Sequence, residues 1–309
     1  MAKKVVLGFS GGLDTSYCVK YLTEEKNYEV HSIIVNTGGF DKDELKQIEE
    51  HAYKLGVKTH KTVDAVQNYY DSIIKYLIFG NVLKNNTYPL SVSAERLSQA
   101  LHIAEHTKEL NADAVAHGST GAGNDQVRFD MVFHIMIPGV EIITPIRDLQ
   151  LSREEEISYL KEKGVDMNFE KSMYSINKGA APMVIIKAHH ALEKHVLTKW
   201  QLQWKDQLAQ FYGNWLHEGQ ILDPVMIDIE RFLESSQRNV TGDVFVQLYP
   251  YRFQVIGIES KYDLMNSRFG KYGEMNTGFT GDDVRGFSKI FGNQTAMYHL
   301  VKEEADGKN

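Results

Sequence analysis

The sequence predicts an α/β fold, a mostly parallel sheet covered by helices on both faces, followed by a second, smaller α+β domain. In the first half of the chain, short apolar segments alternate with helical patterns, which is typical of parallel sheets with helical crossovers. The expected strands are residues 4–9, 30–35, 57–63, 112–116 and 140–143. The expected helices are residues 15–25, 41–55, 66–80, 93–110 and 152–163. Ligands of such sheets bind beyond the carboxyl ends of the strands.

The second half of the chain is mainly helical at first. Residues 182–218 carry an aromatic stripe at helical spacing, which we expect to lie in the core or at a subunit interface. The stripe consists of Trp200, Trp204, Leu208, Phe211 and Trp215. Another helix is expected at 224–234, then a hairpin of 241–248 and 253–258, and a glycine-containing extended arm from 262. His189, His190 and His195 lie in the helical part, where packed or solvated histidines are favoured over metal ligands.

Composition narrows the class of protein. The chain has 309 residues, for which two domains are the natural expectation, and its 42% hydrophobic and 24% charged residues are typical of soluble proteins. We expect no membrane span and no secretory signal. Cys18 is the single cysteine, which excludes an internal disulfide and favours a reducing, cytoplasmic location. A net charge of -7 argues against a nucleic-acid partner.

The first polar loop, residues 8–16, follows the first expected strand. Its adjacent glycines permit a tight turn, and Ser10, Thr15 and Ser16 add hydroxyls near the unpaired N–H groups of a helix start, an arrangement suited to phosphate. The competing interpretation is a plain strand-to-helix turn. The spacing Ser-Gly-Gly-x-Asp-x-Ser resembles the pyrophosphate loop (PP-loop) of ATP pyrophosphatases, which adenylate a substrate and release pyrophosphate.

The second polar loop, residues 117–129, follows the fourth expected strand and contains three glycines. Arg128 can bind a carboxylate with two hydrogen bonds. Thr120 and Asn124 can hold a second carboxylate, and Asp125 can accept from an ammonium group. The loop therefore suits zwitterionic substrates, whereas the competing interpretation is a capped surface loop.

Together with residues 88–93, the two loops resemble argininosuccinate synthase, a family that joins citrulline to aspartate and converts ATP to AMP and pyrophosphate through a citrullyl-adenylate. The similarity also covers residues 144–148, 152–157, 174–176 and 236–242. It implies an adenine nucleotide α-hydrolase-like domain at 1–165, a synthetase and oligomerisation domain at 166–260, and at 261–309 an arm that reaches across a homotetramer.

The resemblance also implies roles for individual residues. ATP would contact Gly8, Phe9, Ser10, Gly11, Gly12, Leu13, Asp14, Thr15, Ser16, Val35 and Gly118. Aspartate would contact Thr120, Asn124 and Asp125, and citrulline would contact Tyr88, Ser93, Asn124, Arg128 and Ser175. As catalytic residues we expect Asp14, which would organise the loop or a metal, and Asp125, which would orient the aspartate amine. Mg²⁺ would bridge the pyrophosphate oxygens with no dedicated protein site.

The sequence departs from the family after Gly179. There the family continues for several dozen residues that include citrulline contacts, whereas this chain passes directly to Ala180-Ala181-Pro182. Because both flanks are intact, we expect a segment outside this sequence rather than a true deletion. Two other functions stay open: a PP-loop pyrophosphatase that transfers an amide or sulfur, which would lack the second loop, and a truncated, non-catalytic nucleotide-binding oligomer.

Overall fold

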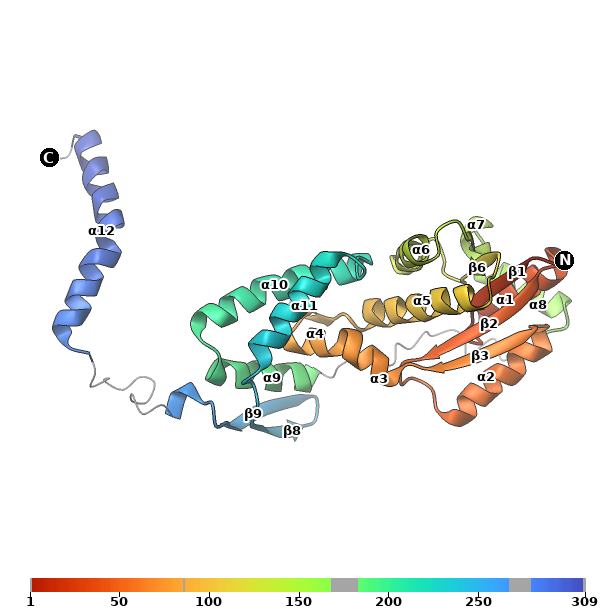
Figure 1. Ribbon diagram of the computed structural model, residues 1–309, viewed down its shortest axis with the longest axis horizontal. Coiled ribbons are helices and arrows are strands. Elements are labelled where there is room, and N and C mark those ends of the chain that lie inside the picture. Colours follow the sequence, from red (N-terminus) through yellow and green to blue (C-terminus); the bar gives the residue numbers. More distant parts are fainter. Residues whose placement is uncertain (1, 86, 168–182, 267–278, 308–309) are drawn as a thin grey trace.

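The structure, a computed structural model, describes residues 2–85, 87–167, 183–266 and 279–307. Its centre is a five-stranded parallel sheet of order β3-β2-β1-β6-β7 (Figure 1). The strands are β1 (Lys4–Gly8), β2 (Glu29–Asn36), β3 (Thr59–Asp64), β6 (Ala114–Ala116) and β7 (Glu141–Ile143). All five expected strands are therefore confirmed, and the crossover between β3 and β6 places β1 in the middle.

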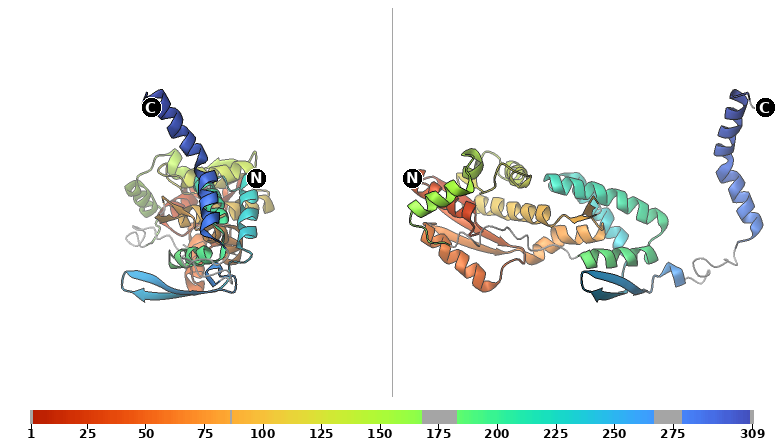
Figure 2. Two further views of the ribbon diagram at one scale, coloured as in Figure 1. Left: turned by 90° about the vertical axis from the view of Figure 1, so that its left-hand side faces the viewer. Right: turned by 180° about the vertical axis from the view of Figure 1, so that it is seen from behind.

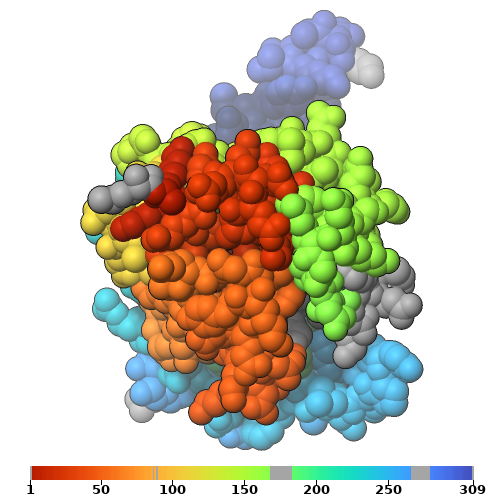
Figure 3. Space-filling view, turned by 90° about the vertical axis from the view of Figure 1, so that its right-hand side faces the viewer, coloured from red at the N-terminus to blue at the C-terminus, as the bar shows by residue number. Residues whose placement is uncertain are grey.

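Each face of the sheet is covered by its own helices, as alternating side chains on β1 require. Val6 packs with α5 (Ser91–Glu109) and α6 (Asp125–Met136) on one face. Val5 and Leu7 pack on the other face with α1 (Leu13–Lys20), α2 (Lys42–Leu55) and α8 (Arg153–Glu162). The space-filling view from the right-hand side of Figure 1 shows the red and orange N-terminal segments packed against the green segment that includes α8 (Figure 3).

The expected helices form, with local variations. Helix α2 begins with a capping box of Asp41 and Glu44 and ends at Gly56, whose φ is 106°. The first helix continues through a π-helical turn, Tyr21–Glu25. The segment expected at 66–80 forms α3 (Val66–Tyr69), a π-helical turn (Tyr70–Ile74) and α4 (Lys75–Phe79).

Other elements differ from the sequence prediction. The second polar loop is shorter than expected, because α6 begins at Asp125. Phe129, Val132, Phe133 and Met136 have the spacing of one helical face, and the first three are buried. The short helix α7 (Pro145–Asp148) and the antiparallel pair β4 (Leu83–Lys84) and β5 (Tyr88–Pro89) were not predicted.

The second region consists of α9 (Met183–Val196), α10 (Lys199–Glu218), α11 (Pro224–Gln237) and the predicted hairpin of β8 (Asp243–Tyr249) and β9 (Arg252–Glu259). A capping box of Thr198 and Gln201 separates α9 from α10. The aromatic stripe is divided, since Leu208 and Trp215 pack against the core whereas Trp200, Trp204 and Phe211 are exposed. Buried residues of α10 and α11 join the same apolar cluster as α5 and α6, so one core connects the two regions.

The described part of the tail is mainly helical rather than extended. Helix α12 (Gly281–Ala305) begins with a capping box of Thr280 and Asp283 and lies apart from the rest of the molecule in Figure 1 and in the right-hand view of Figure 2. It exposes large apolar side chains, including Phe287, Ile290 and Phe291. In the ranges that the structure describes, no helix has both the length and the apolar character needed to cross a membrane.

Candidate active site

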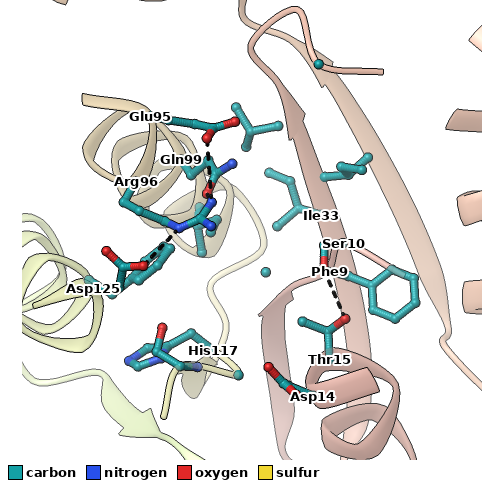
Figure 4. Close-up of a pocket in the computed structure, with 18 of the residues that line it drawn as sticks. Phe9, Ser10, Asp14, Thr15, Ile33, Glu95, Arg96, Gln99, His117 and Asp125 are labelled. Carbon is teal, nitrogen blue, oxygen red and sulfur yellow. Dashed lines mark hydrogen bonds and ion pairs between the residues drawn. The ribbon is translucent and has the colours of Figure 1, made fainter. Parts of the chain in front are cut away.

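A cavity of about 560 Å³ lies at the carboxyl ends of β1, β2 and β6, where the sequence placed its polar loops. Figure 4 shows Ser10, Asp14 and Thr15 on one side of it, and Arg96, Asp125 and His117 on the other. The apolar side chains of Ile33, Ile34, Val35, Phe40 and Ile103 complete the wall. The cavity therefore combines polar edges with an apolar surface that suits a planar ring.

The first polar loop presents hydroxyl groups at the start of α1. Ser10 Oγ lies 3.4 Å from Thr15 Oγ1 and accepts a hydrogen bond from the Gly12 backbone N–H at 3.4 Å. Gly11 has a φ of 75°, and a Cβ there would lie 3.2 Å from Ile48, so the loop depends on glycine at this position. Hydroxyls beside unpaired helix N–H groups are a suitable site for phosphate oxygens.

Not every residue of this loop faces the cavity. Gly8, Phe9, Ser10, Asp14 and Thr15 line it, as do Val35 of β2 and Gly118 of the second polar loop, whereas Gly11, Gly12, Leu13 and Ser16 do not line it. Ser16 is fully buried; its hydroxyl donates to the Gly12 carbonyl at 2.7 Å and lies 3.0 Å from His51 Nε2. The structure thus differs from the expectation that the Ser16 hydroxyl points at phosphate, because His51 of α2 holds it inward.

Asp14 is supported from behind by a buried carboxyl group that sequence reasoning missed. Glu156 of α8 is 3% exposed and shares a side-chain hydrogen bond with Asp14. Burial, and then the charge of Asp14, raise the pKa of Glu156 to about 8. Glu156 is therefore protonated at neutral pH and donates to Asp14, which ties the pyrophosphate loop to α8. The family resemblance covered residues 152–157, but nothing in that segment indicated that Glu156 would contact Asp14.

The α5 wall contributes a second set of residues that the sequence did not single out as site residues. Arg96 Nη1 donates to Gln99 Oε1 at 2.9 Å, and Arg96 Nε donates to Asp125 Oδ2 at 3.4 Å. The Thr37 hydroxyl donates to Glu95 at 2.9 Å, and burial raises the pKa of Glu95. Arg96 lies one turn after Ser93 on the same helix, a spacing that could have indicated it.

The second polar loop is fixed by a chain of hydrogen bonds. His117 Nδ1 accepts from the Ser119 N–H at 3.2 Å, so its Nε2 carries the hydrogen and donates to Asp130 at 2.9 Å. Arg147 donates to the other Asp130 oxygen at 2.6 Å. Although burial opposes the shift, these two hydrogen bonds lower the pKa of Asp130. The loop is thus held as a pre-formed edge of the cavity.

The two loops touch at Gly118. A Cβ at that position would lie 3.3 Å from the Asp14 Cβ and 3.3 Å from the Thr15 methyl group. Thr120, which the resemblance implies would bind the substrate aspartate, lies two residues after Gly118. It is exposed and lines the cavity. Glycine at 118 therefore lets the second loop close against the pyrophosphate loop.

The residues expected to bind citrulline are only partly brought together. Arg128 is 3% exposed and donates through Nη1 to Asp125 Oδ1 at 2.5 Å, and Ser93 is buried on α5. Of these three residues, only Asp125 lines the cavity. Asn124 precedes α6 at the same edge. Tyr88 lies in β5, but its side chain is outside the described residues, as is Ser175 altogether.

No group of three or more His, Cys, Asp or Glu side chains within the described ranges is placed to hold a metal ion. The histidines of the second region instead bond to neighbouring side chains. His189 Nδ1 lies 2.8 Å from Asn81 and its Nε2 lies 2.9 Å from Gln237, while His195 lies 3.2 Å from Asp263.

Two adjoining family models together match residues 4–298 of the chain. Residues 4–166 match the arginosuccinate synthase N-terminal HUP domain, and residues 167–298 match the arginosuccinate synthase C-terminal domain. The chain belongs to the argininosuccinate synthase family. The HUP match agrees with the parallel sheet and with the loop geometry around the cavity.

Relatives of this argininosuccinate synthase family member align along nearly its whole length. The argininosuccinate synthase of Methanocaldococcus jannaschii is 30% identical over 397 aligned positions, covering 98% of this chain and 100% of the relative. That of Xylella fastidiosa is 28% identical over 397 positions, with 97% and 98% covered. Because the alignments exceed the 309 residues of this chain, both relatives contain positions that have no counterpart here.

Proposed function

We propose that this chain is an AMP-forming carbon–nitrogen ligase that joins citrulline and aspartate into argininosuccinate in arginine biosynthesis. The observation that carries the proposal is the contact at Gly118, which brings the hydroxyls of the pyrophosphate loop and the side chains of Thr120 and Asp125 to one cavity. Membership of the argininosuccinate synthase family supports it.

The first step joins citrulline to the nucleotide. The ureido oxygen attacks the α-phosphorus, a phosphorus–oxygen bond forms, and the bond to the bridging oxygen breaks as pyrophosphate leaves. Ser10, Thr15 and the N-terminus of α1 stabilise the charge on the departing group. Mg²⁺ enters as part of the nucleotide substrate. The hydrogen bond from Glu156 favours Asp14 as an organiser of the loop rather than as a metal ligand.

The second step forms the new carbon–nitrogen bond. The α-amino group of aspartate, after losing a proton, attacks the activated ureido carbon, and AMP leaves with the electron pair of the carbon–oxygen bond. Asp125 lies at the edge of the cavity near Thr120, where its carboxylate orients the amine and accepts a proton. Hydrogen bonds from Arg96 and Arg128 fix the position of Asp125. The protein acts chiefly through positioning.

The remaining assignments are part of the same proposal. Aspartate binds Thr120, Asn124 and Asp125. Citrulline binds Tyr88, Ser93, Asn124, Arg128 and Ser175. ATP binds the loop of residues 8–15 together with Val35 and Gly118, whereas the hydroxyl of Ser16 stays bonded to the Gly12 carbonyl. We also propose a cytoplasmic homotetramer divided at 1–165, 166–260 and 261–309, in which the exposed apolar side chains of α12 pack on neighbouring subunits.

The test is pyrophosphate release from MgATP with citrulline and aspartate added singly and together. We expect release to require citrulline, and argininosuccinate to appear only when both amino acids are present. Bound ATP with no release under any combination would instead support a non-catalytic nucleotide-binding oligomer. The relatives' additional positions are the observation that favours this second function.

A further inference from the structure

His217 occupies a position that neither polar loop motif indicates. It lies in the last turn of α10, in the second region of the chain, yet its imidazole contacts residues of α5 and α6 that lie one helical turn from the cavity-lining Arg96 and Asp125. Its Nδ1 lies 3.0 Å from Ser93 Oγ and 3.1 Å from Arg128 Nη2, and its Nε2 lies 3.3 Å from Asn124 Nδ2. Its imidazole thus contacts residues from α5, α6 and the turn before α6. When Nδ1 accepts from Arg128, Nε2 carries the ring hydrogen, so its contact with the amide nitrogen of Asn124, also a donor, is not a hydrogen bond.

The hydrogen-bond directions require a neutral imidazole. Arg128 has only donors, so the ring nitrogen that faces its Nη2 must accept. Arg128 Nε also donates to the backbone carbonyl of His217 at 2.9 Å, which fixes the guanidinium from two sides of the same residue. A protonated ring would lose its acceptor and place a second cation beside Arg128.

Packing holds His217 where it is. Leu216 and Tyr212, on the preceding turns of α10, are fully buried in the apolar cluster that also contains Phe129 and Phe133 of α6. Gly219 ends the helix with a φ of 93°, and a Cβ there would lie 3.4 Å from Arg128 Cα. The last turn of α10 therefore rests directly on α6.

We propose that His217 is a positioning residue that holds Ser93 and Arg128, beside Asn124, in the arrangement that receives the citrulline substrate. The proposal rests on the proposed function and adds to it a residue from the second region. On this proposal, the citrulline side of the site depends on the docking of α10 against α5 and α6. The nucleotide side depends instead on loops that follow strands of the sheet.

Protonation supplies a direct test. The charged groups that act on His217 are Arg128 and Asp125 from α6, Lys84 from β4 and Glu218 from α10 itself. Burial, then Arg128 and Lys84, lower the pKa of His217, while Glu218 and Asp125 oppose them. We therefore expect citrulline affinity to be constant at neutral and basic pH and to weaken as the pH falls through the pKa of His217.

The experiment compares the full chain with His217→Ala, His217→Gln and His134→Ala, an exposed histidine of α6 that serves as the control. Each is assayed for the KM of citrulline, the KM of ATP and the pH dependence of kcat/KM for citrulline. The His217→Ala change removes the imidazole acceptor of Arg128 Nη2 and the contact with Ser93, while the backbone carbonyl still accepts from Arg128 Nε. Because a hydrogen bond to a charged group is lost, the citrulline KM should rise by about 10-fold or more. The ATP KM should stay within about twofold, because Arg128 lies outside the nucleotide side.

Glutamine keeps an acceptor and a donor without titrating. His217→Gln should therefore recover most of the citrulline affinity and lose the acidic limb of the pH profile, while His134→Ala should match the unmodified chain. An active chain in which His217→Ala leaves the citrulline KM unchanged, or raises both KM values equally, overturns the positioning role. An unmodified chain that binds ATP but forms no product under any substrate combination refutes the proposed function, and the role of His217 in receiving citrulline is refuted with it.

Discussion

The two sides of the cavity are built in different ways. The nucleotide side is made by loops at the carboxyl ends of three adjacent strands, β2, β1 and β6, and each loop follows its strand directly. The acceptor side, which we propose to bind citrulline, consists of α5 and α6 and is supported from behind by the last turn of α10, so it depends on two regions of the chain. The nucleotide side is thus specified by short motifs, whereas the acceptor side is specified by helix packing.

This difference matters for a family member shorter than its relatives. A loop that follows its own strand keeps its geometry when a distant segment changes. A site that depends on docking between regions is sensitive to whatever alters that docking. In this chain the docking is maintained by the continuous core that α10 and α11 share with α5 and α6. We therefore expect sequence changes to affect the proposed citrulline side more than the proposed nucleotide side.

The largest effect should follow from separating the two loops. In Gly118→Val, side-chain carbon is forced into a space where atoms of Asp14 and Thr15 already lie 3.3 Å from the position that a Cβ would take. Because reaction geometry tolerates only small displacements, we expect pyrophosphate release to fall by about 100-fold or more. Steady-state kinetics measures the loss, and circular dichroism checks the fold.

Gly121→Ala is the matched control within the same loop, since its Cβ would lie 3.8 Å from Arg147 Cγ, an ordinary contact. It should retain activity within about threefold, because surface substitutions that meet no close neighbour cost little. Equal activity in Gly118→Val and the unmodified chain would show that the loop contact is dispensable.

A smaller and more selective effect is expected at the boundary between the two sides. Asp125→Ala removes the carboxylate that bonds to both Arg96 and Arg128. We expect argininosuccinate formation to fall by about 10²–10⁴-fold, the usual contribution of a positioned acid or base, while ATP affinity changes little. Pyrophosphate and argininosuccinate are measured separately in one reaction. Unchanged product formation would remove the proposed role of Asp125.

The sequence predicted the parts of the molecule that depend on local patterns. Strand periodicity located β1 and β2, and the glycine–hydroxyl spacing located the pyrophosphate loop. It did not predict that Ser16 turns inward, because His51 lies on another helix. It did not identify Glu156 or His217, because each acts through a residue brought close only by tertiary packing. The presence of a glutamate or a histidine in the sequence does not by itself indicate which residue it will contact in the folded protein.

The smallest expected effect concerns the support behind the nucleotide side, and it appears as a pH dependence of stability. The pKa of Glu156 is raised from its ordinary value of 4.5 to about 8 in the folded protein. Between pH 4.5 and pH 8, Glu156 therefore keeps its proton in the folded protein, whereas in the unfolded chain it has already released it. The resulting stabilisation is fully present below pH 4.5 and is lost as the pH rises through 8.

Glu156→Gln keeps a donor to Asp14 but cannot ionise. We expect it to match the unmodified chain near pH 5 and to exceed it at pH 8.5 by about 1 kcal/mol or more, which corresponds to ~2–4 °C in Tm for a protein of this size class. Thermal unfolding from pH 5 to 9 measures the difference. Glu154→Gln is the control, because Glu154 is exposed on the same helix and should give a difference that does not vary with pH. If the Tm difference between Glu156→Gln and the unmodified chain is also independent of pH, Glu156 is already ionised beside Asp14. In that case Glu156 donates no hydrogen bond to Asp14, and the link between α8 and the pyrophosphate loop is refuted.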